Sequence, residues 1–285
     1  MLDPKPGDFI VDGTVDGGGH AGAILQEIMP AGTFLGVDWD ATMIAKKQPA
    51  YMREYYRHGN YAELPEILEQ GKFGLADALL VDLGFSSEQI TGSGRGFSFG
   101  EASAGEPLKM TYDDSQTPLA ELLRGLTEEE LANVIYEFGG ERRSRAIAKA
   151  IVLAGKTKRI VTSGELARIV RSAVPGNYEH GRIDPATRTF QALRIYANNE
   201  LGNLKKLLGE LGRIVKPGGR VAIISFHSLE DKIVKEAFRA GAKDGSLELL
   251  TKKPVAASHE EEMRNPRSRS AKLRAAVVGK GISHQ

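Results

Sequence analysis

Short apolar runs and amphipathic stretches alternate along the first hundred residues of the chain. The apolar runs have the length of buried strands and cover 9–12, 33–38, 55–58 and 78–83. The stretch after the first run places apolar side chains at helical spacing, as at Ile24, Leu25 and Ile28. Strands that alternate with helices predict a parallel sheet with helices on both faces.

The pattern changes after about residue 114. Amphipathic helical stretches follow, and two of them begin with capping-box sequences that start at Thr127 and Thr162. No strand pattern is evident between 115 and 183. We therefore predict an all-helical insertion domain over 115–183.

The alternating pattern then resumes in the last hundred residues. A helix is expected over 201–215, followed by a Lys-Pro-Gly-Gly turn and an apolar strand over 220–226. Two shorter strands are expected near 247–250 and 271–278. The fold class is thus α/β, with a Rossmann-like sheet built from 1–114 and 184–285.

The composition says more about the cellular compartment of the protein than about the molecules it binds. The 285 residues carry 38 basic and 37 acidic side chains, so the net charge does not indicate a nucleic-acid partner. Cysteine is absent, which excludes disulfides and thiolate metal sites and agrees with a cytoplasmic protein. No apolar run approaches the roughly 18 residues that a membrane span needs.

A glycine loop after the first strand predicts a cofactor site. Residues 16–20 read Asp-Gly-Gly-Gly-His, and the second strand ends at Asp38, where a carboxylate can accept hydrogen bonds from a ribose diol. The loop does not fit the dinucleotide pattern G-x-G-x-x-G. Asp12 and Asp16 would repel a diphosphate but suit a ligand with an amino group and a sulfonium. S-adenosylmethionine is such a ligand.

Four further segments carry candidate chemistry. Asp82 ends the fourth strand and either faces the same crevice or caps the next turn. A loop with Arg95, Phe97 and Phe99 suits stacking on an unpaired base, or simply packs over the sheet edge. Arg188 opens a helix and could bind phosphate or form a salt bridge.

The segment from Ser225 to Asp231 contains serine, histidine and aspartate, but residues so close in sequence rarely reach triad geometry. We expect Ser228 and Asp231 to form a capping box and His227 to line the crevice or to belong to the helix start. Two basic clusters, over 141–159 and 264–274, are either phosphate contacts or solvated faces.

Taken together, these segments resemble the bacterial 16S ribosomal-RNA cytosine-N4 methyltransferases, the RsmH or MraW family. The resemblance rests on Asp12-Gly13-Thr14 with Gly17-Gly18-Gly19-His20, on 82–87 and on 95–99. It continues in 185–192, 224–231 and 265–274, in the family's order and over nearly the whole chain.

The resemblance implies a class I S-adenosylmethionine methyltransferase fold with a helical insertion, and methylation of the exocyclic N4 of a cytidine in the decoding region of small-subunit 16S rRNA. It implies no metal, and it leaves a homodimer open. The catalytic candidates are Asp82, Ser86 and Ser87. The cofactor-binding candidates are Gly18, Gly19, His20, Asp38, Tyr61, Asp82 and Gln89. The RNA-binding candidates are Arg95, Phe97, Phe99, Arg188, His227, Arg267 and Arg269.

The chain departs from the family pattern at several positions. Asp16 stands where the family usually has glycine, Asp184 where histidine is usual, and Lys109 lies in a segment that is usually more acidic. Two other functions compete with the methyltransferase: a nucleotide-dependent dehydrogenase, and a non-catalytic RNA-binding or ribosome assembly protein that keeps the fold.

Overall fold

The computed structural model describes residues 1–84, 93–178 and 183–279, and the chain forms two compact units. Unit 1 consists of Met1–Gly84 and Leu201–Gln285, and unit 2 of Phe85–Glu200. The insertion expected over 115–183 falls inside unit 2, and its limits stay a prediction. Among the described residues, no helix is long and apolar enough to cross a membrane.

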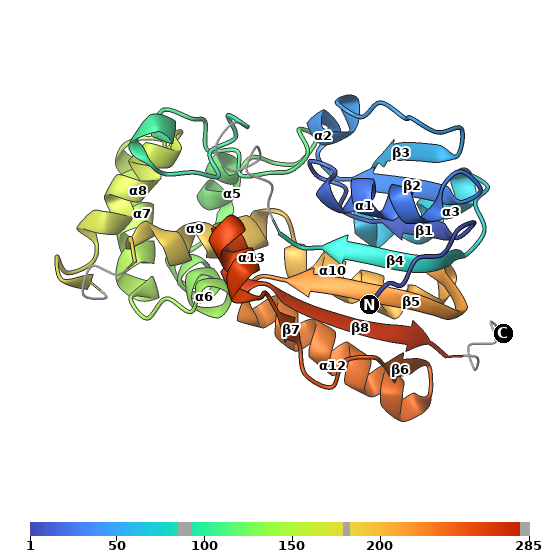
Figure 1. The fold of residues 1–285 in the computed structure, drawn as a ribbon. Helices are drawn as coiled ribbons and strands as arrows, with labels where there is room; N and C mark the ends of the chain where they lie inside the picture. Colours follow the sequence, from blue (N-terminus) through green and yellow to red (C-terminus); the bar gives the residue numbers. More distant parts are fainter. Residues whose placement is uncertain (85–92, 179–182, 280–285) are drawn as a thin grey trace. The chain divides into compact units, whose positions relative to one another are not determined.

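Unit 1 is built on one mixed sheet (Figure 1). Its described strands are β1 (Phe9–Asp12), β2 (Thr33–Asp38), β3 (Glu54–His58), β4 (Ala76–Asp82), β5 (Val215–Ser225), β6 (Leu247–Leu249), β7 (Val255–Ala256) and β8 (Lys272–Val278). Their order is β3-β2-β1-β4-β5-β8-β6, with β7 paired to β8. The first five strands in this order run parallel, and β8 is antiparallel to β5 and β6. The chain therefore reverses its direction of winding between β1 and β4, where ligands bind in open α/β sheets.

Alternating side chains along the strands bury both faces of this sheet. Ile10, Phe34 and Leu80 belong to one apolar cluster, while their neighbours in sequence, such as Val11 and Leu35, belong to another. Successive strand residues point to opposite faces, so a run of apolar residues needs helices on both sides. This is why β1 and β2 carry almost no polar side chains before the aspartate that ends each of them.

Helices cover the two faces. The helical elements of unit 1 are α1 (Gly19–Ile28), α2 (Ala41–Ala45), the 3-10 helix η1 (Tyr61–Glu63), α3 (Leu64–Gln70), α10 (Glu200–Gly209), α11 (Leu211–Ile214), α12 (Ser228–Asp244), α13 (His259–Arg264) and the 3-10 helix η4 (Pro266–Ser270). Helix α1 packs Ala21, Ile24 and Ile28 into one cluster. Helices α3, α10 and α12 contribute to the other cluster.

The helix expected over 201–215 is interrupted by Glu210, which is the N-cap of α11. The Lys-Pro-Gly-Gly turn lies within the bounds of β5, where the register between β4 and β5 shifts and Gly218 has a φ of 86°. Both differences are local, and the predicted order of helix, turn and strand holds.

Unit 2 is helical. Its described helical elements are η2 (Glu101–Ser103), α5 (Leu119–Gly125), α6 (Glu128–Gly139), α7 (Ser144–Thr157), α8 (Ser163–Ser172) and α9 (Ala186–Ala197). Thr127 and Thr162 form the two predicted capping boxes, each accepting from the N3 backbone while the N3 glutamate accepts from the cap residue. One apolar cluster joins Leu131, Ile147 and Leu166 from three of these helices.

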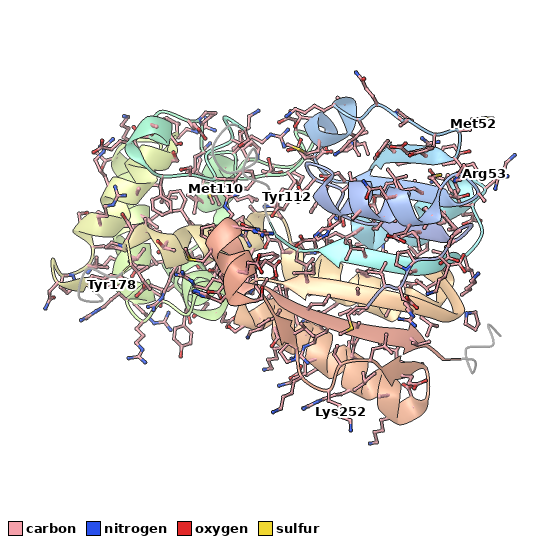
Figure 2. All side chains as sticks on the ribbon, viewed as in Figure 1. Met52, Arg53, Met110, Tyr112, Tyr178 and Lys252 are labelled. Carbon is pink, nitrogen blue, oxygen red and sulfur yellow. The ribbon has the colours of Figure 1, made fainter. Side chains whose placement is uncertain are left out.

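The segment before α5 is tied to the last helix of unit 2. The amide of Asn198 donates to the carbonyl of Met110, and its oxygen accepts from the backbone N–H of Tyr112. Figure 2 labels Met110 and Tyr112, with the side chains drawn as sticks. Met110 has a φ of 52°, so this segment is a sharp bend held by side-chain hydrogen bonds.

Candidate active site

Three carboxylates stand at one edge of the unit 1 sheet because three parallel strands end there. Asp12, Asp38 and Asp82 are the last residues of β1, β2 and β4. Strand β1 pairs with both other strands, with Asp12 opposite Gly36 and Leu80. The structure thus brings together the acids that the sequence placed at strand ends.

The loop between β1 and α1 passes over this edge. Gly18 has a φ of 91° and is the N-cap of α1, and no side chain caps the helix there. Atoms of the described residues leave the space beside Gly17 and Gly19 open, since a Cβ built on either would meet none within 4 Å. Glycines with open space at an uncapped helix start allow a ligand to approach the backbone closely.

Asp38 holds the loop with both of its oxygens. Oδ2 accepts the backbone N–H of Asp16 at 2.8 Å, and Oδ1 accepts that of Asp40 at 2.8 Å. Burial raises the pKa of Asp38 to about 6, although these two hydrogen bonds favour the ionised form. Each oxygen keeps a second lone pair, so Asp38 can still accept from a ligand hydroxyl.

Asp12 is the deepest acid of the group, with 1% of its surface exposed. Its Oδ1 accepts the backbone N–H of Thr14 at 3.1 Å, while its Oδ2 has no hydrogen-bond partner among the described residues. Burial raises the pKa of Asp12 to about 7, and the negative charges of Asp82 and Asp38 raise it further. A buried oxygen without a partner costs free energy, which a polar or cationic ligand group would recover.

Asp16 takes a backbone conformation that favours glycine, with a φ of 40°. Its pKa is raised to about 9, first by burial and then by the charges of Asp38, Asp82 and Asp12. At neutral pH this side chain is therefore protonated. Asp16 thus adds a neutral carboxyl group to the loop, and not the negative charge that the sequence led us to expect.

Asp82 is paired with His20, the second residue of α1. Its Oδ2 lies 3.2 Å from His20 Nε2, and its Oδ1 accepts the backbone N–H of Gly84 at 3.0 Å. The hydrogen bond to Asp82 raises the pKa of His20. The backbone N–H of Asp82 donates to Thr14 Oγ1 at 2.6 Å, which locks the end of β4 to the glycine loop.

Of the remaining cofactor-binding and catalytic candidates, one lies among the residues that the structure describes and three do not. Tyr61 opens η1 and is half-buried, and a Cβ built on Gly13 would lie 3.3 Å from the Tyr61 Cβ. Tyr61 is thus a neighbour of the loop. Ser86, Ser87 and Gln89 lie outside the described residues, so their roles stay predictions.

The RNA candidates of unit 2 make contacts within that unit. Arg95 is 7% exposed, and its guanidinium donates to the carbonyls of Thr111 and Tyr112. Phe97 stacks on Tyr112 with ring centroids 5.5 Å apart. Their proposed contacts with RNA stay predictions, and the observed contacts hold the bend before α5.

Phe99 and Arg188 are likewise engaged inside unit 2. The ring centroids of Phe99 and Phe190 are 4.6 Å apart, and the guanidinium of Arg171 lies 5.9 Å from the Phe99 ring centroid. Arg188 Nη1 donates to the hydroxyl of Tyr178 at 3.4 Å. A role in RNA binding is untested for both residues.

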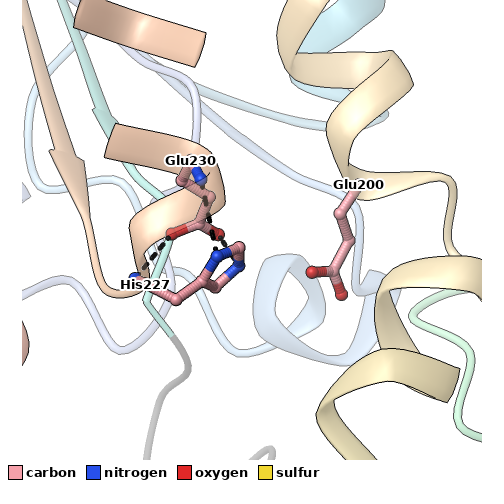
Figure 3. Close-up of side chains that lie close together, drawn as sticks. All are labelled: Glu200, His227 and Glu230. Carbon is pink, nitrogen blue, oxygen red and sulfur yellow. Dashed lines mark hydrogen bonds and ion pairs between the residues drawn. The ribbon is translucent and has the colours of Figure 1, made fainter. Parts of the chain in front are cut away.

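His227 caps α12, and the predicted capping box was wrong by one residue. Its Nδ1 accepts the backbone N–H of Glu230, and Glu230 Oε2 accepts the backbone N–H of His227 (Figure 3). Asp231, expected to pair with Ser228, instead accepts from Arg274 Nε at 2.7 Å on β8. The long-range ion pair to a buried arginine outweighs the local cap.

Arg267 and Arg269 lie on η4 and are exposed. Arg269 Nε lies 3.6 Å from Glu262 Oε2, a distance at which an exposed ion pair contributes little. The RNA contacts of both arginines stay predictions.

Sequence reasoning gave Thr14 no role at the site and did not single out Lys47. Thr14 Oγ1 ties two strand ends, and Lys47 Nζ lies 3.0 Å from a Cβ built on Gly18. A threonine two residues after a strand-end aspartate is a local turn signal that could have been used. No local signal marks Lys47, because it reaches the loop only through the fold.

Comparison with known proteins identifies a family. The model of the MraW methylase family matches residues 1–278. Proteins named ribosomal RNA small subunit methyltransferase H are similar: that of Syntrophotalea carbinolica is 42% identical over 96% of this chain and 93% of its own, and that of Coprothermobacter proteolyticus is 45% identical over 95% and 89%. A solved rRNA methylase from Streptococcus thermophilus aligns over 98% of this chain and 90% of its own, at 7% identity and a TM-score of 0.43.

Proposed function

The chain belongs to the MraW methylase family, and from this premise we propose that it transfers a methyl group from S-adenosylmethionine to the exocyclic N4 of a cytidine in the decoding region of 16S rRNA. The observation that carries the proposal is the group of acids at the sheet edge. It combines the unpartnered Oδ2 of Asp12, the loop-bound Asp38 and the carboxylate of Asp82. The names of the relatives support the rRNA substrate.

The residues present fit the cofactor. A positively charged ligand would stabilise the ionised forms of Asp12 and Asp38, whose pKa values burial raises. Gly18 and Gly19 would admit it at the start of α1, Asp38 would accept its ribose hydroxyls, and Tyr61 would border it. His20 and Gln89 complete the proposed cofactor set. When bound, the cofactor supplies a methyl carbon that its sulfonium makes electrophilic.

Asp82 is the proposed catalytic residue. The N4 amine of cytosine is a poor nucleophile because its lone pair is delocalised into the ring. Asp82 would accept a hydrogen bond from this amine and take its proton as the methyl transfers. The Gly84 N–H fixes one carboxylate oxygen, which leaves the other, now paired with His20, to face a substrate. Ser86 and Ser87 would shape the pocket.

The cytidine must leave its stack to reach such an edge, as in other enzymes that modify bases. Holding N4 and the methyl carbon in line supplies much of the rate in a site of this kind. The proposed RNA contacts are Arg95, Phe97, Phe99 and Arg188 of unit 2 and His227, Arg267 and Arg269 of unit 1. The proposal includes a cytoplasmic protein that acts on the small ribosomal subunit, and it admits a homodimer, which analytical ultracentrifugation measures.

Incubation with radiolabelled S-adenosylmethionine and small subunits that lack the modification tests the proposal. We expect N4-methylcytidine in the digested 16S rRNA, and far slower formation of it with Asp82→Asn. Equilibrium dialysis of the cofactor runs in parallel. Cofactor binding without any methylated cytidine would contradict the proposed reaction.

The second candidate is a non-catalytic RNA-binding or assembly protein. It predicts that the protein binds small subunits equally well with and without Asp82, and that the wild type transfers no methyl group. A nucleotide-dependent dehydrogenase predicts instead that NAD binds and S-adenosylmethionine does not. The methylation assay tests the RNA-binding candidate, and dialysis with NAD and with S-adenosylmethionine tests the dehydrogenase.

A further inference from the structure

Unit 2 contains a groove of about 650 Å³, called here the basic groove. Its lining residues come from two segments: one within 120–126, in and just after α5, and one within 151–160, in and just after the second half of α7. The volume lies in the range of small-ligand sites in proteins. All of its lining residues belong to unit 2, so the groove is complete within that unit.

All charged side chains that line the groove are positive. Its lining residues include Arg124, Lys156, Lys158 and Arg159, and no acid is among them. Arg159 Nη2 lies 3.3 Å from Glu121 Oε1. Lys158 Nζ lies 2.6 Å from Glu165 Oε1.

The other two cationic side chains can bind an anion. The side chains of Arg124 and Lys156 are exposed and form neither an ion pair nor a hydrogen bond with the residues the structure describes. Three glutamates, 128–130, follow the groove in sequence, but none of them lines it. The groove therefore offers two unpaired positive charges to an anion.

The floor of the groove is apolar. Ile151 and Ile160 are buried there, and Leu123, Leu126 and Val152 are half-buried. Gly155 lies in α7, and a Cβ built on it would meet no described atom within 4 Å. Gly155 is exposed and lines the groove, so the missing side chain leaves the space beside the apolar residues open.

We propose that the basic groove binds a single-stranded segment of RNA. Arg124 and Lys156 would contact two phosphates, and an unpaired base would lie on the apolar floor. A nucleotide joins an anion to a flat, weakly polar ring, and both parts match this lining. An acidic peptide would match the cations alone.

This RNA contact goes beyond the proposed function. It rests on that function in one respect: the RNA bound in the cell would be rRNA. The groove would hold RNA equally in the ground state and in the transition state. Removing its charges should thus raise KM for small subunits and leave kcat unchanged.

The test is fluorescence anisotropy of a labelled 12-nucleotide oligouridylate, with the full-length protein and a KCl titration. Each phosphate contact with a single strand adds about 0.7 to the slope of log Kobs against log salt. R124Q/K156Q should lower the slope by about 1.4 and weaken binding roughly 25-fold at 0.1 M salt. The matched control is R239Q/K243Q, which removes two cations from α12, one of them also in the last turn of its helix.

Gly155→Leu gives an independent reading because it keeps every charge and fills the floor. It should weaken oligouridylate binding and leave the salt slope unchanged. Thermal melting confirms that each variant is folded. None of these readings needs methyl transfer, so a failed methylation assay and a failed groove assay are distinguishable.

Two results would overturn the proposal. In the first, R124Q/K156Q keeps the salt slope of the wild type, just as the control R239Q/K243Q does. In the second, a 12-residue polyglutamate peptide binds the wild type as tightly as the oligouridylate and loses the same fraction of affinity in R124Q/K156Q. That second result would assign the groove to an acidic protein segment.

Discussion

The raised pKa values of the buried acids at the sheet edge predict that the stability of the unliganded protein falls as the pH rises, and Asp16 should contribute most to this fall at neutral pH. Its pKa rises from 3.8 to about 9 on folding, because of burial and of the charges of Asp38, Asp82 and Asp12. Between these two values the folded protein binds more protons than the unfolded chain. The stabilising effect of that proton is complete below pH 3.8 and is lost as the pH rises toward 9.

The size of the effect follows from the linkage relation. One carboxyl group titrating in this way lowers the free energy of unfolding by about 1.4 kcal/mol per pH unit. From pH 6 to pH 8, Asp16 alone should therefore remove about 3 kcal/mol. Asp38, with a pKa of about 6, adds to the loss mainly below pH 6, and Asp12, with a pKa of about 7, adds to it up to about pH 7.

Asp16→Asn isolates the contribution of Asp16. Asparagine is close in shape, tolerates a positive φ and keeps the backbone N–H that donates to Asp38, but it does not ionise. Between pH 6 and pH 8 the wild type should lose about 3 kcal/mol more than this variant. With a urea m-value of about 3 kcal/mol/M, that is a difference of about 1 M in the shift of the unfolding midpoint.

Urea unfolding followed by circular dichroism at pH 6, 7 and 8 measures these shifts without cofactor. Asp244→Asn is the control, because a hydrogen bond from Ser246 lowers the pKa of Asp244 and the group is ionised throughout this range. Equal losses in the wild type and in Asp16→Asn would show that Asp16 is ionised in the folded protein. The reasoning about the clustered acids would then be refuted.

Three further predictions follow from single contacts. Asp38→Ala should weaken S-adenosylmethionine binding roughly 10- to 150-fold in equilibrium dialysis, because it removes charged hydrogen bonds worth about 1.5–3 kcal/mol. An unchanged affinity would show that Asp38 does not bind the cofactor. Asp82→Asn should lower kcat for methyl transfer by about 10²- to 10⁴-fold, and wild-type turnover in this variant would exclude Asp82 as the proton acceptor. Thr127→Ala should reduce the free energy of unfolding by about 1 kcal/mol through loss of the cap of α6, which urea unfolding compared with the exposed Thr117→Ala measures.

The sequence by itself determined the order of the main strands and helices, but the ends of only some of them. Strands β1 and β2 have the predicted bounds, because buried strands in a parallel sheet are continuous apolar runs that stop at a polar residue. The capping boxes at Thr127 and Thr162 were also predictable from local sequence, because a capping box involves residues only three positions apart. The strand-end acids followed from these local patterns.

Only the tertiary structure decided which distant groups meet. The contacts of His20 with Asp82, and of Thr14 with the backbone of Asp82, join residues more than 60 positions apart. The ion pair between Asp231 and Arg274 displaced the expected cap in the same way. Pairings of this kind depend on strand order and register, and the pKa values of the acids depend on burial and on neighbouring charges, none of which a local pattern of residues contains.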